Sequence, residues 1–141
     1  MSNTIFIVSA EHSTVSSNIN YARTQSLRRM LETAGLNVIE VAGMYKGQAE
    51  HSILVAPSPF SAEDTRQIVL RAAQNFEQES VLEINNTGHS WLLEPYTGTQ
   101  EFIGRMVRVK ARDIDGKKVS GYTGLGDGSF LALEHEVNGD E

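Results

Sequence analysis

Tyr45 and Glu50 are the residues of this chain with the clearest potential for chemistry. They lie in the segment GMYKGQAEHSILV, residues 43–55, where Gly43 and Gly47 bracket the tyrosine and the glutamate directly precedes an apolar run. A phenol and a carboxylate on a short ordered loop can hold a small polar ligand, because loops on a rigid scaffold often carry binding groups. The alternative is an ordinary hairpin loop whose tyrosine and glutamate face solvent.

Motifs for the common catalytic and metal chemistries are missing from the sequence. No cysteine is present, which excludes disulfides and thiolate metal sites. Asp113–Gly116 begins like a calcium loop but no suitably placed glutamate follows, so a hairpin turn is expected there. Gly124–Gly128 precedes a strand and not a helix, which argues against a phosphate site. We expect no metal and no cofactor, since none of the histidines has a metal-binding spacing; these are His12, His51, His89 and His135.

Length and charge restrict the class of protein. The chain has 141 residues, so one domain is expected, and its 40% hydrophobic and 21% charged residues are ordinary for a soluble globular protein. The formal net charge of -6 argues against nucleic-acid binding and suits a cationic ligand or a partner with a basic surface. The N-terminal segment has neither the basic flank of a signal peptide nor the length of a membrane span, so we expect a cytoplasmic protein.

Apolar periodicity predicts the order β-α-β-β-α-β up to residue 84. One helix should begin at Ser17 or Asn18 and end at Gly35, and a second should begin at Ser61 with an acid three residues later. The predicted strands are 5–8, 36–42, 52–56 and 81–84. This order is typical of an α+β fold, the ferredoxin-like split βαβ, in which both helices cover one face of an open antiparallel sheet.

The C-terminal third is predicted to be rich in strands. Alternation and turn residues favour strands at 90–93, 106–111, 119–122 and 130–133, with Asp115-Gly116 as the turn of a hairpin. We therefore expect a ferredoxin-like core over residues 1–95, followed by a β-hairpin extension and an acidic, frayed tail over residues 96–141 of the same domain. The uncovered sheet face should lie near Trp91–Leu93 and should be buried in an oligomer.

The predicted topology suggests where a pocket would form. The end of the first strand (Val8, Ser9 and Ala10) can lie near the loop into the first helix and near the segment around Tyr45. Backbone groups of that strand, together with Tyr45 and Glu50, would then make a polar pocket of modest size.

Several segments, over roughly residues 5–95, resemble the small S-adenosylmethionine (SAM) lyases of bacteriophages, long called SAM hydrolases. The matching segments are Phe6–Ala10 with its V-S-A opening, Asn20 and Arg23 with Leu27 and Leu31, Gly43-x-Tyr45 with Glu50, Ala73–Leu82, and the turn Thr87–His89. The resemblance implies a homotrimer with substrate bound between subunits, and cleavage of SAM to methylthioadenosine and homoserine lactone. It also implies a phage protein in the host cytoplasm that removes the methyl donor of host restriction systems.

The resemblance further implies roles for individual residues. Tyr45 and Glu50 would be catalytic, and the substrate-binding residues would be Val8, Ser9, Ala10, Asn20, Arg23 and His89. The substrate's own carboxylate can attack the carbon next to the sulfonium, so no base is required, and a charge against the sulfonium would stabilise the ground state more than the transition state. Glu50 is therefore assigned to the ribose hydroxyls or to the ammonium group.

Three alternatives remain at this point. Water could attack the same carbon with Glu50 as general base, which would make the protein a hydrolase that yields homoserine. The chain could instead be a non-catalytic ligand-binding module, since ferredoxin-like domains host many functions. It could also be a phage protein that inhibits a host enzyme by contact.

Asn20 and Arg23, one turn apart, could equally form a solvated helix face.

Overall fold

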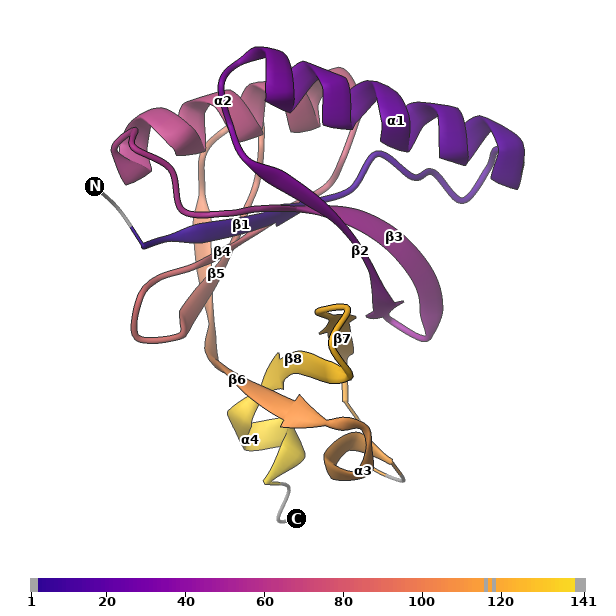
Figure 1. Ribbon diagram of the computed structural model, residues 1–141, viewed down its shortest axis with the longest axis vertical. Helices are drawn as coiled ribbons and strands as arrows, with labels where there is room; N and C mark the ends of the chain where they lie inside the picture. Colours follow the sequence, from indigo (N-terminus) through magenta and orange to yellow (C-terminus); the bar gives the residue numbers. More distant parts are fainter. Residues whose placement is uncertain (1–2, 116, 118, 139–141) are drawn as a thin grey trace.

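The structure is a computed structural model that describes residues 3–115, 117 and 119–138. Its strands are β1 (Ile5–Val8), β2 (Val38–Tyr45), β3 (Gln48–Val55), β4 (Val81–Ile84), β5 (His89–Leu93), β6 (Gln100–Lys110), β7 (Gly121–Gly124) and β8 (Ser129–Leu133). Its helices are α1 (Ser17–Thr33), α2 (Ala62–Asn75), α3 (Ala111–Ile114) and α4 (Glu134–Val137). The strands close into an antiparallel barrel in the order β1-β3-β2-β7-β8-β6-β5-β4. In Figure 1, α1 and α2 lie across one side of the barrel, and β6, β7 and β8 form the opposite side.

β1 is apolar on both faces, and both of its faces are buried. Phe6 and Val8 of β1 are 0% and 1% exposed and pack beneath the two long helices. Ile7, between them, points to the other face of the sheet and packs with Leu54 and Ile84 inside the barrel. Because successive side chains of a strand alternate in direction, one short strand contributes to two separate apolar clusters.

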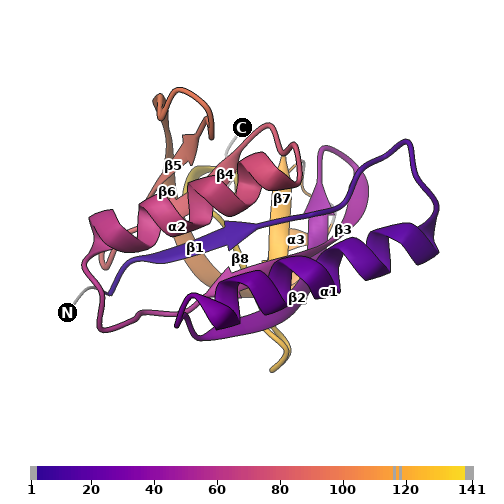
Figure 2. The same ribbon diagram turned by 90° about the horizontal axis from the view of Figure 1, so that it is seen from above.

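Local signals set the ends of the long helices. Ser16 caps α1 by accepting a hydrogen bond from the Ile19 amide, one or two residues before the predicted cap, and Gly35 follows the helix with φ +96°. Ser61 caps α2 through the Asp64 amide, as predicted. The two helices lie side by side over the sheet (Figure 2). A bidentate pair at 2.6 and 2.9 Å, between the Arg66 guanidinium and the buried Glu83 carboxylate, ties α2 to β4.

The prediction of an open ferredoxin-like sheet is wrong. The strands β4, β1, β3 and β2 do lie next to one another in that order, but both edges of this arc are paired, β2 with β7 and β4 with β5. The C-terminal strands therefore close the sheet. The face expected to be uncovered near Trp91–Leu93 is covered within the chain, since Leu93 is 1% exposed and Trp91 packs against the helix-side core.

Three local predictions also need correction. The predicted loop at 43–51 is mostly strand: β2 and β3 are joined by the two-residue turn Lys46-Gly47, whose φ angles of 51° and 78° are those of a tight hairpin. The predicted hairpin between 106–111 and 119–122 does not form, because β6 pairs with β5 and β8. Residues 111–114 form α3 and Gly116 lies outside the described residues. The expected frayed tail includes α4, which packs on β6, and its last three residues lie outside the described range.

The contact between β2 and β7 depends on two glycines. A Cβ on Gly43 would overlap the Tyr122 carbonyl oxygen and lie 2.9 Å from the Thr123 Cα. A Cβ on Gly121 would lie 2.7 Å from the Met44 carbonyl oxygen. The two backbones therefore approach closely only because both positions lack a side chain.

Arg23 of α1 holds the segment that follows β1. Its Nε donates to the Ala10 carbonyl at 2.5 Å, and its Nη2 donates to the Phe76 carbonyl at 2.8 Å. Its guanidinium also lies 5.5 Å from the centre of the Phe76 ring. One side chain thus joins α1, the chain after β1 and the end of α2.

No helix among the described residues is long and apolar enough to cross a membrane.

Gly43→Ala should destabilise the protein by at least about 1–3 kcal/mol, because the added methyl group meets backbone atoms that cannot rotate away. Urea unfolding measures this loss. Ala49→Ser, which adds one atom to an exposed residue of the neighbouring strand, should change the stability by less than about 0.5 kcal/mol. Equal stabilities of Gly43→Ala and the wild type would show that β7 does not approach β2 this closely.

Arg23→Ala should lower the free energy of unfolding by about 1.5–3 kcal/mol, since it removes charge-assisted hydrogen bonds to two backbone carbonyls. Arg29→Ala is the matched control on the same helix, because Arg29 is exposed and its contact with the Ser26 hydroxyl is a long one of 3.5 Å. If both variants unfold at the same urea concentration, Arg23 does not hold the segment after β1.

Candidate functional site

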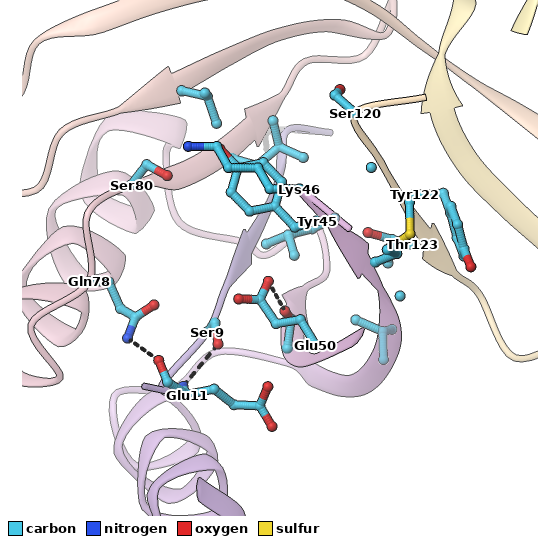
Figure 3. A pocket seen from close by; sticks show the side chains of 18 of the residues that line it. Ser9, Glu11, Tyr45, Lys46, Glu50, Gln78, Ser80, Ser120, Tyr122 and Thr123 are labelled. Carbon is cyan, nitrogen blue, oxygen red and sulfur yellow. Dashed lines mark hydrogen bonds between the residues drawn. The ribbon is translucent and has the colours of Figure 1, made fainter. Parts of the chain in front are cut away.

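A cavity of about 600 Å³ opens at one end of the barrel. Its polar side chains come from four parts of the chain: the segment after β1, the β2–β3 hairpin, residues 77–80 before β4, and β7 with the residue before it (Figure 3). Its volume falls within the range of roughly 300–1,000 Å³ that is common for small-molecule sites. The apolar part of its wall includes Ile7, Val41, Leu82, Leu92, Ile103, Met106, Leu131 and Leu133.

Glu50 lies in this cavity on β3, on the same face as Ser52 and Leu54. The Ser52 hydroxyl is 3.4 Å from the Glu50 Oε1 and donates to it. Burial raises the pKa of Glu50, and the negative charge of Glu11 raises it further, while the neighbouring Ser52 and Ser9 hydroxyls act in the opposite direction. Glu50 is thus a carboxylate whose ionised form is disfavoured until a cation or a donor reaches it.

Glu11 is held beside the cavity by its neighbours. Its amide donates to the Ser9 Oγ at 3.0 Å, and its carbonyl accepts from the Gln78 Nε2 at 3.0 Å (Figure 3). The His51 amide donates to the Glu11 Oε1 at 3.1 Å, and the His51 Nδ1 lies 3.3 Å from Oε2. Ser9 in turn donates to the His51 carbonyl at 3.3 Å. The end of β1 and the start of β3 are therefore joined through one network.

Tyr45 and Lys46 stand at the hairpin end of the cavity. Both side chains line it, and the Lys46 Nζ lies 5.2 Å from the centre of the Tyr45 ring. The Lys46 amide donates to the Ser120 carbonyl at 2.9 Å, which joins the turn to the segment before β7. The tight turn thus brings an aromatic ring and a cation to the mouth of the cavity.

The structure brings together three of the predicted site residues, Ser9, Tyr45 and Glu50. The side chains of Val8 and Ala10 point away from the cavity into the helix-side core, where they are 1% and 0% exposed. Only the backbone of these two residues remains available near the cavity.

The other predicted site residues lie behind the cavity or away from it. Asn20 lines a neighbouring groove and holds the His12 backbone, accepting from its amide at 2.8 Å and donating to its carbonyl at 3.0 Å. Arg23 lines neither space and makes the backbone contacts described above. His89 is exposed beyond the other end of β4, where its Nδ1 lies 2.7 Å from the Thr87 Oγ1.

Sequence reasoning missed several residues of the cavity. Glu11 and Ser52 could have been predicted from the sequence. Each lies two residues after a predicted site residue, Ser9 or Glu50, on the same face of a strand or its extension. Gln78, Ser80, Tyr122 and Thr123 could not, because they reach the cavity only through the folding of distant segments.

The lining of the cavity is acidic. Among the described residues its charged side chains are one lysine, Lys46, and four glutamates, Glu11, Glu50, Glu77 and Glu79. Such a lining favours a ligand that carries positive charge. Groups of three or more His, Asp or Glu side chains that could hold a metal ion are not found in the described part of the chain.

Comparison with known proteins agrees with this chemistry. A search of curated proteins found no match. The family model described as the S-adenosylmethionine lyase family matches residues 6–132, a span that includes the barrel except for the first residue of β1 and the last residue of β8, and every cavity-lining residue except Leu133. The match also extends well beyond residue 95, where the resemblance in the sequence ended. The chain belongs to the S-adenosylmethionine lyase family and is therefore a SAM-cleaving enzyme.

Proposed function

We propose that this enzyme cleaves SAM to methylthioadenosine and L-homoserine lactone, with the substrate bound in the cavity at the end of the barrel. The observation that carries the proposal is the lining of this cavity, an apolar wall inside the barrel with carboxylates at its mouth. SAM has matching parts, since its sulfonium and ammonium groups are cationic and its adenine is a flat, weakly polar ring.

The proposed reaction needs no group from the protein to form or break a bond. An oxygen of the substrate carboxylate attacks the γ-carbon, and the bond between that carbon and sulfur breaks with its electron pair moving to sulfur. The sulfonium becomes the neutral thioether of methylthioadenosine, and the methionine chain closes into a five-membered lactone. No proton is transferred, so the enzyme has to fold the chain into the attack geometry, an effect worth up to roughly 7–11 kcal/mol.

An apolar wall favours this reaction for an electrostatic reason. The carboxylate and the sulfonium lose their opposite charges as the transition state forms, so a site of low polarity destabilises the reactants more than the transition state. Ile7, Leu82 and Met106 belong to the apolar cluster inside the barrel and also line the cavity. The same wall would keep competing water from the γ-carbon.

Tyr45 and Glu50 orient the substrate in this proposal. Glu50 binds the ribose hydroxyls or the ammonium group, and Tyr45 packs against the methionine arm or donates its hydroxyl to it. Ser9 and the backbone of Val8 and Ala10 bind the ends of the ligand, while Asn20 and Arg23 hold that segment in place from behind. His89 lies at the far end of the barrel and would reach substrate only from a neighbouring subunit.

The resemblance to the phage enzymes supports two further parts of the proposal. One is a homotrimer with sites between subunits. The other is a counter-restriction role, in which the enzyme lowers the SAM concentration available to host restriction systems. Neither part requires the contact with a host enzyme that the sequence left open.

Hydrolysis is the second candidate, and one observation favours it. Glu50 is partly buried with a raised pKa, which is the condition in which a glutamate can act as a general base. Water activated by Glu50 would attack the same γ-carbon and give homoserine directly.

Cleavage in ¹⁸O-labelled water separates the two reactions. If the substrate carboxylate attacks, the lactone trapped early carries no label, and its later hydrolysis places label on the carboxyl group only. Mass spectrometry of the products after the first turnovers measures this. Label on the homoserine hydroxyl from the first turnover would overturn the lyase proposal and would favour Glu50 as the general base.

Glu50 should also make SAM binding depend on pH. Because its pKa is raised in the free enzyme, the carboxylate becomes neutral as the pH falls toward the usual glutamate range, and the KM for the cationic substrate should rise. Glu50→Gln should have a high KM at all pH values, with no such dependence in this range. A KM profile of the variant that parallels the wild type would assign the dependence to another group.

The same variant should be more stable than the wild type. A raised carboxyl pKa means that the folded state binds more protons than the unfolded state at pH values between the unfolded-state and the folded-state pKa. The free energy of unfolding therefore falls as the pH rises through this range. At neutral pH the ionised Glu50 therefore costs stability, and thermal unfolding of Glu50→Gln should occur at a higher temperature. This gain in stability with a loss of function would mark Glu50 as a site residue.

A further inference from the structure

We propose that Glu11 binds the α-ammonium group of SAM and that His51 is the residue that positions it. The proposal rests on the proposed function, and it assigns the binding of the charged methionine arm to a residue directly after the V-S-A segment. Glu11 lines both the barrel cavity and the neighbouring groove, so it stands where the two spaces meet.

Glu11 is preorganised in a way that an ordinary surface glutamate is not. Ser9 and Gln78 fix its backbone, each at 3.0 Å, and two groups of His51 fix its carboxylate. Its side chain is only 20% exposed, whereas the side chain of His51 is 71% exposed. Little conformational entropy therefore remains to be lost when a ligand binds this carboxylate.

The Glu11 carboxylate still has capacity for a ligand. A carboxylate offers about four lone-pair sites, and His51 uses one on each oxygen. Among the described residues, neither Glu11 nor Glu50 forms an ion pair with a lysine or arginine. The charge of Glu11 nevertheless acts on Glu50, whose pKa it helps to raise. Two partly buried carboxylates that repel each other without such a partner favour a bound cation.

The ammonium group is the better partner than the sulfonium. Its charge does not change during lactone closure, so binding it stabilises the ground state and the transition state alike, which lowers KM and leaves kcat unchanged. With Glu11 on the ammonium, Glu50 is left for the ribose hydroxyls.

Glu11→Gln tests this assignment with two substrates. The KM for SAM should rise about 10- to 150-fold, the range for a lost hydrogen bond to a charged group, while kcat stays within a few-fold of the wild type. The KM for the deamino analogue, which keeps the sulfonium and carboxylate but lacks the ammonium, should be unchanged. The inhibition constant of methylthioadenosine should also be unchanged, which shows that the variant is folded. Glu101→Gln removes the same charge from the exposed surface of β6 and should behave as the wild type.

His51 variants test the positioning role. His51→Asn retains a side-chain N–H close to the position of Nδ1 and should keep the KM for SAM near the wild-type value. His51→Ala should raise that KM by less than Glu11→Gln does, because the backbone amide still holds one carboxylate oxygen. Neither variant should affect the deamino analogue.

Two results would overturn the proposal. One is an unchanged KM for SAM in Glu11→Gln, and the other is an equal rise for SAM and the deamino analogue. Failure of the proposed function is a separate outcome, seen in the wild type as labelled hydroxyl in the products. In that case the comparison of the two KM values still tests whether Glu11 binds the ammonium.

Discussion

The close approach of β2 and β7 is the constraint on which the rest of the structure depends. Gly43 and Gly121 allow the two backbones to pair where any side chain would collide with the opposite strand. This pairing, with the short β7–β8 contact, converts an arc of strands into a closed barrel. Closure gives each strand a partner on both sides and helps to form the cavity, because Tyr122 and Thr123 of β7 form part of its wall.

The central strands are buried on both faces, and the side chains on the two faces have different roles. Phe6 and Val8 support α1 and α2, which anchor the sheet, while Ile7 and Leu54 supply the apolar interior of the barrel. At the end of the barrel the same alternation continues with polar residues, as Ser9 follows Ile7 and Ser52 and Glu50 precede Leu54. The cavity is therefore a continuation of the barrel interior, apolar at depth and charged at the mouth.

The charges at this mouth are costly in the free protein, and that cost relates the structure to its ligand. Burial and the proximity of Glu11 both disfavour ionised Glu50. A cationic substrate such as SAM relieves this repulsion when it binds, whereas the neutral thioether product of the proposed reaction would relieve it less. If the proposed reaction holds, the arrangement favours the substrate over that product, which suits an enzyme that must release it.

The sequence by itself determined the features that depend on near neighbours. The apolar run of β1, the Ser61 cap of α2 and the end of α1 at Gly35 follow from local sterics and hydrogen bonding, and they were predicted within a residue or two. The order of motifs also predicted the correct family, and the predicted site residues Ser9, Tyr45 and Glu50 line the cavity.

Only the tertiary structure decided how the sheet closes and which side chains meet. The pairing of Gly43 with Thr123 joins residues far apart in the chain, and nothing in the local pattern of β7 distinguishes a partner of β2 from a partner of β6. The same holds for Glu11. It is a candidate substrate-binding residue because β3 places His51 against its carboxylate. The physical reason is that strand pairing and charge proximity are non-local. The sequence specifies which face of each strand is apolar, whereas the fold determines what lies opposite that face.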